Sequence, residues 1–172
     1  MGDTAVRTSA HDGRGPRRER GAALVEFALV VPIFVLLVMG MIDFAIVFND
    51  YNSVRQGVRE GARQAVVANW SLGGCTTGSS TDRVVCTTKE RIALDPARTR
   101  VRVKLEGTYQ PGDSLTVCSM YQLRSTTSFF KVILDNKVAT SKISMRIEQI
   151  DDAAPVTTGG ESALTGQDWS WC

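Results

Sequence analysis

The chain has 172 residues and a net charge of +2, so it is long enough for one modest domain with additional segments and too weakly basic to indicate nucleic-acid binding. Its only histidine, His11, lies near the N-terminus, which excludes a His-dependent catalytic triad or a His-rich metal site in the body of the chain. No glycine-rich phosphate-binding motif occurs, and no metal or cofactor is expected.

Residues 1–21 are polar, rich in arginine and glycine, and predict a basic leader without regular structure. Its arginines lie directly before an apolar run. Since positive charge next to a membrane span stays in the cytoplasm, the leader is expected inside and the residues after about 45 outside.

The apolar run is the most distinctive feature of the sequence. Between Arg20 and Asp43 the only charged residue is Glu26. As a helix, these 22 residues are about 33 Å long, close to the thickness of a bilayer's hydrocarbon core. We interpret 22–42 as a transmembrane helix. The alternatives are a buried core helix and a cleaved signal peptide, although the run is long for a signal peptide and no A-x-A pattern follows it.

Two residues within the run are unusual for a simple anchor. Glu26 is either a functional carboxylate or a side chain that snorkels to water at the cytoplasmic end. Pro32 lacks an amide hydrogen and is expected to kink or loosen the helix, or is a tolerated proline without a role.

The helix is predicted to continue beyond the membrane as an extension over 43–68, because apolar residues recur at steps of three and four. The stripe comprises Phe44, Val47, Tyr51, Val54, Val58, Ala62 and Ala65. Arg55, Arg59 and Arg63 form a basic ridge on another face, which is either solvated or contacts an acidic partner. The spacing of Gly57 and Gly61 permits close approach of another backbone.

The remainder predicts an α+β domain over 69–150, with one short helix followed by an antiparallel sheet of about three strands. A loop over 69–81 precedes a helix capped by Asp82 that ends near Leu94. Alternation predicts strands over 100–106, 114–123 and 139–149, with a turn over 110–113. Residues 125–136 are expected to pack onto the core, and 151–172 to form a polar tail pinned at its end.

Four cysteines, Cys75, Cys86, Cys118 and Cys172, all follow the apolar run and include no C-x-x-C pair. This spacing favours disulfides in an oxidising compartment over a zinc site. Three pairings are possible, and we favour Cys75–Cys86 with Cys118–Cys172.

Several of these motifs are familiar together. The stretch from Arg20 through Gly21, Ala22 and Glu26 to Phe27 resembles the processing site of type IV-like prepilins, and with the following VPIF and REGAR blocks the chain resembles the TadE-like proteins of tight-adherence (Flp) pili. The resemblance covers about 20–68, more loosely 100–149, but not the 125–137 insert, the cysteines or the tail.

The resemblance implies cleavage after Gly21 by a prepilin peptidase, and subunit assembly through Glu26, Phe27 and Pro32. The implied protein is a minor pilin or pseudopilin that acts in pilus assembly, initiation or adhesion, and not an enzyme. Its implied partners are the peptidase, the major Flp pilin, other minor pilins, the membrane assembly platform and the bilayer. The alternative is a single-pass envelope protein whose external domain binds a partner without entering a filament. A membrane-tethered hydrolase is disfavoured, because no acidic pair is directed to a common cleft.

Overall fold

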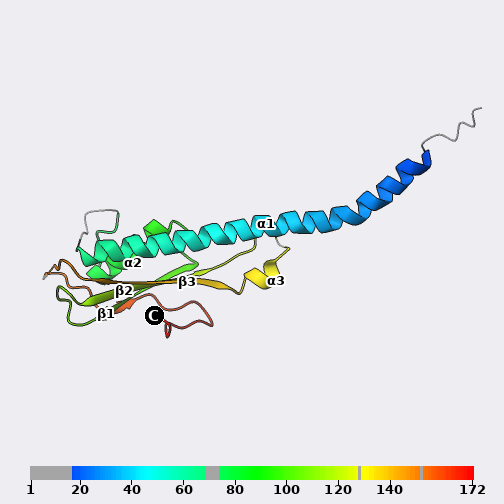
Figure 1. The fold of residues 1–172 in the computed structure, drawn as a ribbon. Coiled ribbons are helices and arrows are strands. Elements are labelled where there is room, and N and C mark those ends of the chain that lie inside the picture. Colours follow the sequence, from blue (N-terminus) through cyan, green and yellow to red (C-terminus); the bar gives the residue numbers. More distant parts are fainter. Residues whose placement is uncertain (1–16, 69–73, 128, 152) are drawn as a thin grey trace, which may run out of the picture. The chain divides into compact units, whose positions relative to one another are not determined.

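The computed structural model describes residues 17–68, 74–127, 129–151 and 153–172 (Figure 1). The elements in these ranges are α1 (Arg17–Val66), α2 (Ser80–Ile92), β1 (Thr99–Glu106), β2 (Ser114–Gln122), α3 (Lys131–Leu134), β3 (Val138–Arg146) and β4 (Gly159–Gly160). The chain divides into two compact units, one ending at Val38 and one running from Met39 to Cys172. The α+β class is confirmed, whereas most of the predicted leader, residues 1–16, lies outside the described residues.

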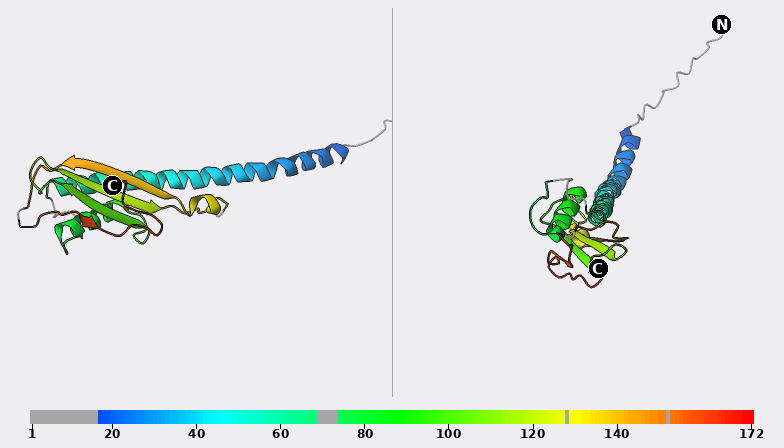
Figure 2. Two further views of the ribbon diagram at one scale, coloured as in Figure 1. Left: turned by 90° about the horizontal axis from the view of Figure 1, so that it is seen from below. Right: turned by 90° about the vertical axis from the view of Figure 1, so that its left-hand side faces the viewer.

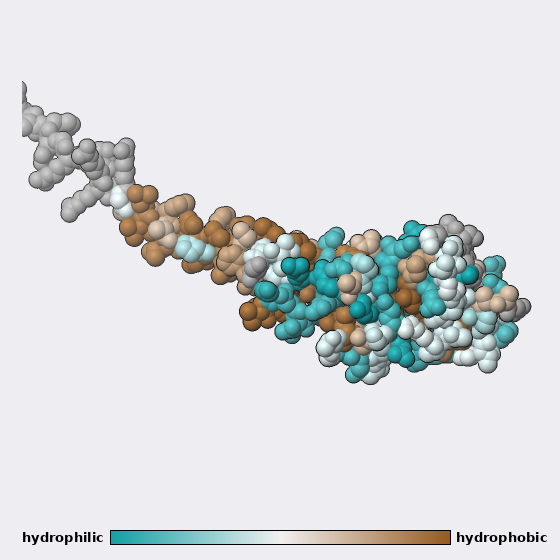
Figure 3. Space-filling model, turned by 180° about the vertical axis from the view of Figure 1, so that it is seen from behind, coloured by the Kyte–Doolittle hydropathy of each residue, from teal (hydrophilic) through white to brown (hydrophobic). Residues whose placement is uncertain are grey.

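The first unit contains the N-terminal part of α1. The residues from Gly21 to Val30 are all exposed, and the helix continues through Pro32. Figure 3 shows apolar atoms over this part of the helix.

The second unit is built on the C-terminal part of α1. Val54, Val58, Ala62 and Ala65 are completely buried, which confirms this half of the predicted stripe. Its first half differs, since Phe44 is 71% exposed and Val47 packs only partly against the core. The helix also ends two residues earlier than predicted, at Val66.

Helix α2 packs directly on the two glycines of α1. A Cβ at Gly57 would lie 2.5 Å from the backbone nitrogen of Ile92, and one at Gly61 would lie 2.9 Å from Cβ of Thr88.

The predicted cap of α2 is wrong. Ser79 is the N-cap, and Asp82 is the third helical residue of a capping box, in which each side chain bonds the other residue's amide. The helix therefore begins inside the predicted loop.

The sheet is antiparallel in the order β3-β2-β1-β4 (Figure 2). Val101 lies opposite Ser119 and Val103 opposite Val117, so these residues share the face that contributes to the core. The predicted turn before β2 is present. Asp113 accepts hydrogen bonds from the amides of Thr108 and Gln110. The three predicted strands are confirmed with small changes at their ends.

Strand β3 ends at Arg146, earlier than predicted, because the next residues bond elsewhere. The amides of Glu148 and Gln149 both donate to the carbonyl of Val66, at 2.9 and 3.0 Å. Carbonyl groups in the last turn of a helix have no partner within the helix. These two residues therefore satisfy the end of α1 instead of extending the sheet.

The C-terminal residues 153–172 are more structured than the predicted polar tail. They supply β4, whose Gly160 lies opposite Arg102 of β1. A Cβ at Gly160 would lie 2.7 Å from the carbonyl oxygen of Val101, so this close approach requires glycine. The amide of Leu164 also contacts Sδ of Met120 at 3.4 Å, which helps explain why β2 is buried on both faces.

The insert between β2 and β3 was expected to pack onto the core, and this prediction is wrong for its apolar residues. Helix α3 has no buried residue. Phe129, Val132 and Ile133 are 61%, 92% and 60% exposed. Phe130 and Leu134 are partly buried beside α1, and the hydrogen bonds that attach the insert to α1 come from residues 125–127.

Candidate functional site

The residues predicted to act in processing and assembly lie on the exposed apolar part of α1. An 18-residue window of this helix has a mean hydropathy of 2.7 and is not buried. The helix is long and apolar enough to cross a bilayer, which suggests a single-pass membrane protein. Glu26, Phe27 and Pro32 are all exposed, and a Cβ at Gly21 would meet nothing within 4 Å. Gly21, Ala22 and Glu26 lie on consecutive turns of one helix, α1.

The first buried carboxylate of α1 follows directly after this apolar segment. Asp43 is only 2% exposed and accepts four hydrogen bonds from the start of the insert. The hydroxyls of Ser125 and Thr127 donate to Oδ2 at 2.8 and 2.6 Å, and the amides of Thr126 and Thr127 donate to Oδ1 at 3.0 and 3.1 Å. Both carboxylate oxygens are therefore satisfied without a cation.

This arrangement favours the ionised form of Asp43. The hydrogen bond from the Thr127 hydroxyl, aided by that of Ser125, lowers the pKa of Asp43 below its ordinary value, although burial opposes the shift. Bonds to a carboxylate are stronger than bonds between neutral groups. In the sequence, Asp43 marks only the end of the apolar run. Its partners are at least 82 residues away, and no local pattern identifies them.

Both disulfides have the pairing favoured from the sequence. Cys75 is bonded to Cys86 and Cys118 to Cys172, with Cα–Cα distances of 5.7 and 6.0 Å. The carboxylate of Glu90 lies near the first pair, but these two sulfurs are joined to each other and are not free thiolates. This cluster is therefore explained as a disulfide.

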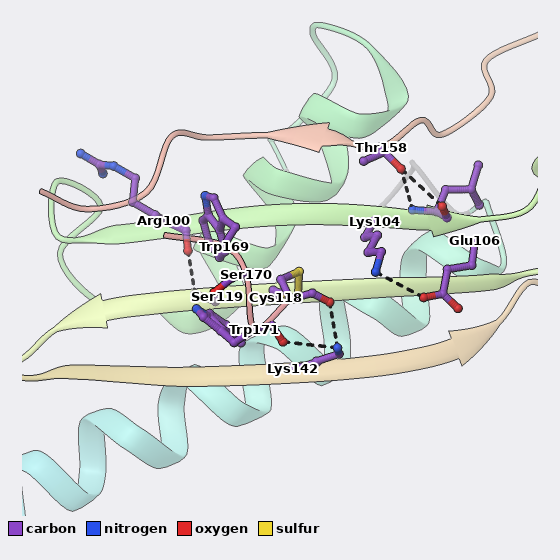
Figure 4. Close-up of a disulfide and its surroundings, with 12 residues drawn as sticks. Arg100, Lys104, Glu106, Cys118, Ser119, Lys142, Thr158, Trp169, Ser170 and Trp171 are labelled. Carbon is purple, nitrogen blue, oxygen red and sulfur yellow. Dashed lines mark hydrogen bonds and ion pairs between the residues drawn. A yellow bond between two sulfur atoms is a disulfide. The ribbon is translucent and has the colours of Figure 1, made fainter. Parts of the chain in front are cut away.

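The second disulfide fixes the C-terminus on the outer face of the sheet (Figure 4). Lys142 Nζ donates to the carbonyl oxygen of Cys172 at 2.8 Å. The rings of Trp169 and Trp171 are 5.7 Å apart, and their indole nitrogens donate to the carbonyls of Glu161 and Asp168. The terminal tryptophans are thus held by polar contacts as well as by the disulfide.

The predicted basic ridge is exposed along α1. Arg55 lies over the Tyr51 ring, with Cζ 5.7 Å from the centroid. Arg63 pairs with Glu60 at 2.9 Å, and this bond, with one from Gln64, lowers the pKa of Glu60 to about 2. The guanidinium of Arg63 is therefore partly neutralised within its own helix. Arg59 lines a shallow cleft of about 180 Å³ together with Arg55 and Ile143.

A second polar cavity, of about 390 Å³, lies near the insert and was not predicted. Asp50, Arg98, Tyr121 and Arg124 contribute to its lining. Burial raises the pKa of Asp50, against the opposing charge of Arg98. Burial also raises the pKa of Tyr121, whose ring centroid lies 5.2 Å from Cζ of Arg98. No second carboxylate lines this cavity among the described residues, so the acidic pair of a hydrolase is not assembled there.

Residues 21–63 match the family model of TadE-like proteins. The resemblance inferred from the sequence is confirmed for this segment, which includes the apolar run and the basic ridge. No curated protein and no solved structure matches the chain.

Proposed function

Because residues 21–63 are TadE-like, we propose that the chain is a structural minor pilin or pseudopilin of a tight-adherence (Flp) pilus. In this proposal a prepilin peptidase cuts after Gly21, and the mature protein takes part in pilus assembly, initiation or adhesion. The family match supports an association with Tad pili and a structural, non-enzymatic role.

One observation carries the proposal: the apolar run of α1 is largely exposed and contains a single carboxylate, Glu26. Leu24, Phe27 and Ile33 are 69%, 68% and 71% exposed, and Glu26 lies among them. A bilayer covers such a surface before assembly, and the helices of neighbouring subunits cover it in a filament. A carboxylate in lipid is unfavourable, so its presence indicates a function beyond anchoring.

Cleavage would give Glu26 a partner. The new N-terminus at Ala22 carries an ammonium group, and in an apolar bundle each charge alone is unfavourable. Pairing the Glu26 carboxylate with the ammonium of a neighbouring subunit offsets much of that cost and favours the in-register arrangement. Phe27 adds apolar contact area, and Pro32, which cannot donate to the carbonyl of Ala28, loosens the helix where subunits pack.

The proposed topology has the N-terminus in the cytoplasm and the second unit outside the cytoplasmic membrane. Assembly would then carry the protein into the extracellular pilus. The two disulfides support this orientation, because they persist in oxidising compartments. The proposed partners are the peptidase, the assembly platform, the major Flp pilin and other minor pilins. The exposed Arg55 and Arg59 offer charge to an acidic surface of one of them.

The test is Glu26→Gln in cells that assemble the pilus. This variant should still lose residues 1–21, by intact mass, and should still contain both disulfides. Its recovery in sheared pili, or crosslinked to the major pilin, should fall at least about tenfold relative to the membrane fraction, because a buried unpaired ammonium costs roughly 3–5 kcal/mol. Glu106→Gln, an exposed carboxylate on the sheet, is the matched control and should be recruited normally.

Two results would contradict the proposal. Normal recruitment of Glu26→Gln would make Glu26 a snorkelling residue. Wild-type protein that keeps residues 1–21 in piliated cells would favour the alternative of an envelope protein that stays in the membrane.

A further inference from the structure

Three large apolar side chains of the insert have no cover within the described chain. They are Phe129, Val132 and Ile133, at 61%, 92% and 60% exposed, and we call them the apolar lobe. Isolated exposed apolar residues are common, but an adjacent group indicates a contact surface. Two basic residues, Lys131 and Lys137, flank the lobe and are also exposed.

The lobe lies beside the end of the apolar segment of α1. A Cβ at Gly40 would be 3.3 Å from the ring of Phe130, the neighbour of Phe129. A groove of about 230 Å³ separates the two helices and is lined mainly by apolar side chains of both, including Phe44, Val47 and Ile133. In Figure 3, apolar atoms gather at this end of the second unit.

The insert is held at this level of α1 by the buried carboxylate described above. Asp43 receives its four hydrogen bonds from residues 125–127, and the lobe begins two residues after Thr127, at Phe129. A second carboxylate, Asp135, accepts from the amide of Ser125 at 3.1 Å and closes the base of the insert. The insert is therefore attached to α1 through Asp43 and closed on itself through Asp135, so the lobe is not part of a free loop.

The position of the lobe matches the edge of a bilayer. Twenty helical residues from Gly21 rise about 30 Å, the thickness of the hydrocarbon core, and so reach Gly40. Apolar side chains at that level meet the boundary between acyl chains and headgroups. Lysines beside them extend their ammonium groups to the headgroup phosphates.

We propose that the apolar lobe inserts into the lipid leaflet on the side of the second unit and holds that unit against the membrane before assembly. The insert that carries the lobe packs beside Gly40, near the end of the apolar run, and a bilayer that surrounds this run would also reach the lobe. A specific protein interface needs roughly 1,200 Å² of buried surface, more than three side chains supply, whereas interfacial membrane contacts use a few apolar groups. The proposal depends on the membrane span and not on entry into a filament.

The test places an environment-sensitive fluorescent amino acid at Val132 in the full chain, reconstituted in liposomes of anionic phospholipids brominated near the top of the acyl chains. Emission should fall about twofold relative to unbrominated lipid, because interfacial side chains lie about 5–10 Å into the boundary. The same probe at Phe34 should be quenched by lipids brominated deeper in the chains. A probe at Glu106, which is exposed on the sheet, is the matched control and should be unaffected.

A second variant separates lipid contact from misfolding. Phe129→Ser with Ile133→Ser changes only exposed side chains, so both disulfides should form, while quenching at position 132 should drop towards that of the Glu106 control. An unquenched probe at 132, with normal quenching at 34, would overturn the proposal. So would emission at 132 that changes with protein density but not with bromination, which would identify a second copy as the occupant. Neither result bears on pilus recruitment.

Discussion

A single carboxylate, Asp43, joins two stretches of chain that lie 82 to 84 residues apart. Aspartate favours helix caps and turns over helix interiors, so a buried aspartate within a helix is unusual. Here burial is offset by four donors, two hydroxyls and two amides, on residues 125–127. Each donor would lose its acceptor if the carboxylate were removed, and buried donors without acceptors are destabilising.

We predict that Asp43→Ala releases the insert without unfolding the sheet. Hydrogen exchange at the Thr126 and Thr127 amides should accelerate, while exchange within β1 and β2 stays at the wild-type rate. Asp168→Ala, which removes an exposed carboxylate bonded to Ser170, should leave the insert unchanged. Unaltered protection of Thr127 in Asp43→Ala would show that the hydrogen bonds do not hold the insert.

The same contact should respond to acid. Because the pKa of Asp43 is lower in the folded protein than its ordinary value of 3.8, its contribution is complete above that value and is lost as the pH falls through the lower folded pKa. Protection of the Thr127 amide, corrected for the intrinsic exchange rate, should therefore persist at pH 5 and decline only in stronger acid.

At the scale of elements, the contact between α1 and α2 depends on the absence of side chains at two positions. Glycine is a poor helix former, by about 1 kcal/mol relative to alanine. Glycine is nevertheless required at positions 57 and 61, because Ile92 and Thr88 occupy the space that a Cβ would fill. Close packing of α2 in turn brings Val84 and Ile92 into the core.

Gly57→Ala should therefore destabilise the protein despite its better helix propensity. The added methyl meets the backbone of Ile92, which cannot move away as a flexible side chain would, and overpacking of this kind costs about 1–3 kcal/mol. Urea unfolding of the full chain in detergent measures the difference. Gln56→Ala, at an exposed position of the same helix, is the control and should be nearly neutral. Equal or greater stability of Gly57→Ala would refute the packing argument.

At the scale of the whole molecule, two disulfides that differ in sequence separation stabilise the second unit. Cys75–Cys86 links residues 11 apart, and Cys118–Cys172 links residues 54 apart. The shorter bridge joins the chain before α2 to the helix itself. The longer one holds the C-terminal segment over the sheet. There Lys142 donates to the carbonyl of Cys172, and Glu161 of the segment accepts a hydrogen bond from the amide of Val101.

Removing the longer bridge should cost more stability than removing the shorter one. The chain-entropy relation gives about 4 kcal/mol for Cys118→Ser with Cys172→Ser, and about 3 kcal/mol for Cys75→Ser with Cys86→Ser. The first double variant should also change the fluorescence of Trp169 and Trp171, which the second should leave unchanged. Denaturant midpoints and emission spectra of the two variants test this order, and a larger loss from the shorter bridge would contradict it.

The sequence by itself determined helices α1 and α2, strands β1 to β3 and their order, but neither α3 nor β4. The apolar run, the stripe from Val54 to Ala65 and the alternation in 100–106 are local patterns, and local patterns reflect helix and strand periods directly. The preferred cysteine pairing was also correct, and in it the two cysteines nearest in sequence, Cys75 and Cys86, are joined.

Only the tertiary structure decided which side chains meet across long separations. The partners of Asp43, the end of β3 on the carbonyl of Val66, the β4 strand at Gly160 and the exposed apolar lobe each depend on residues distant in sequence. Hydrophobicity alone predicted a buried 125–136 segment, because apolar residues usually lie inside. Composition does not reveal that the core space is already filled, nor that a buried carboxylate holds the insert beside the end of the apolar helix.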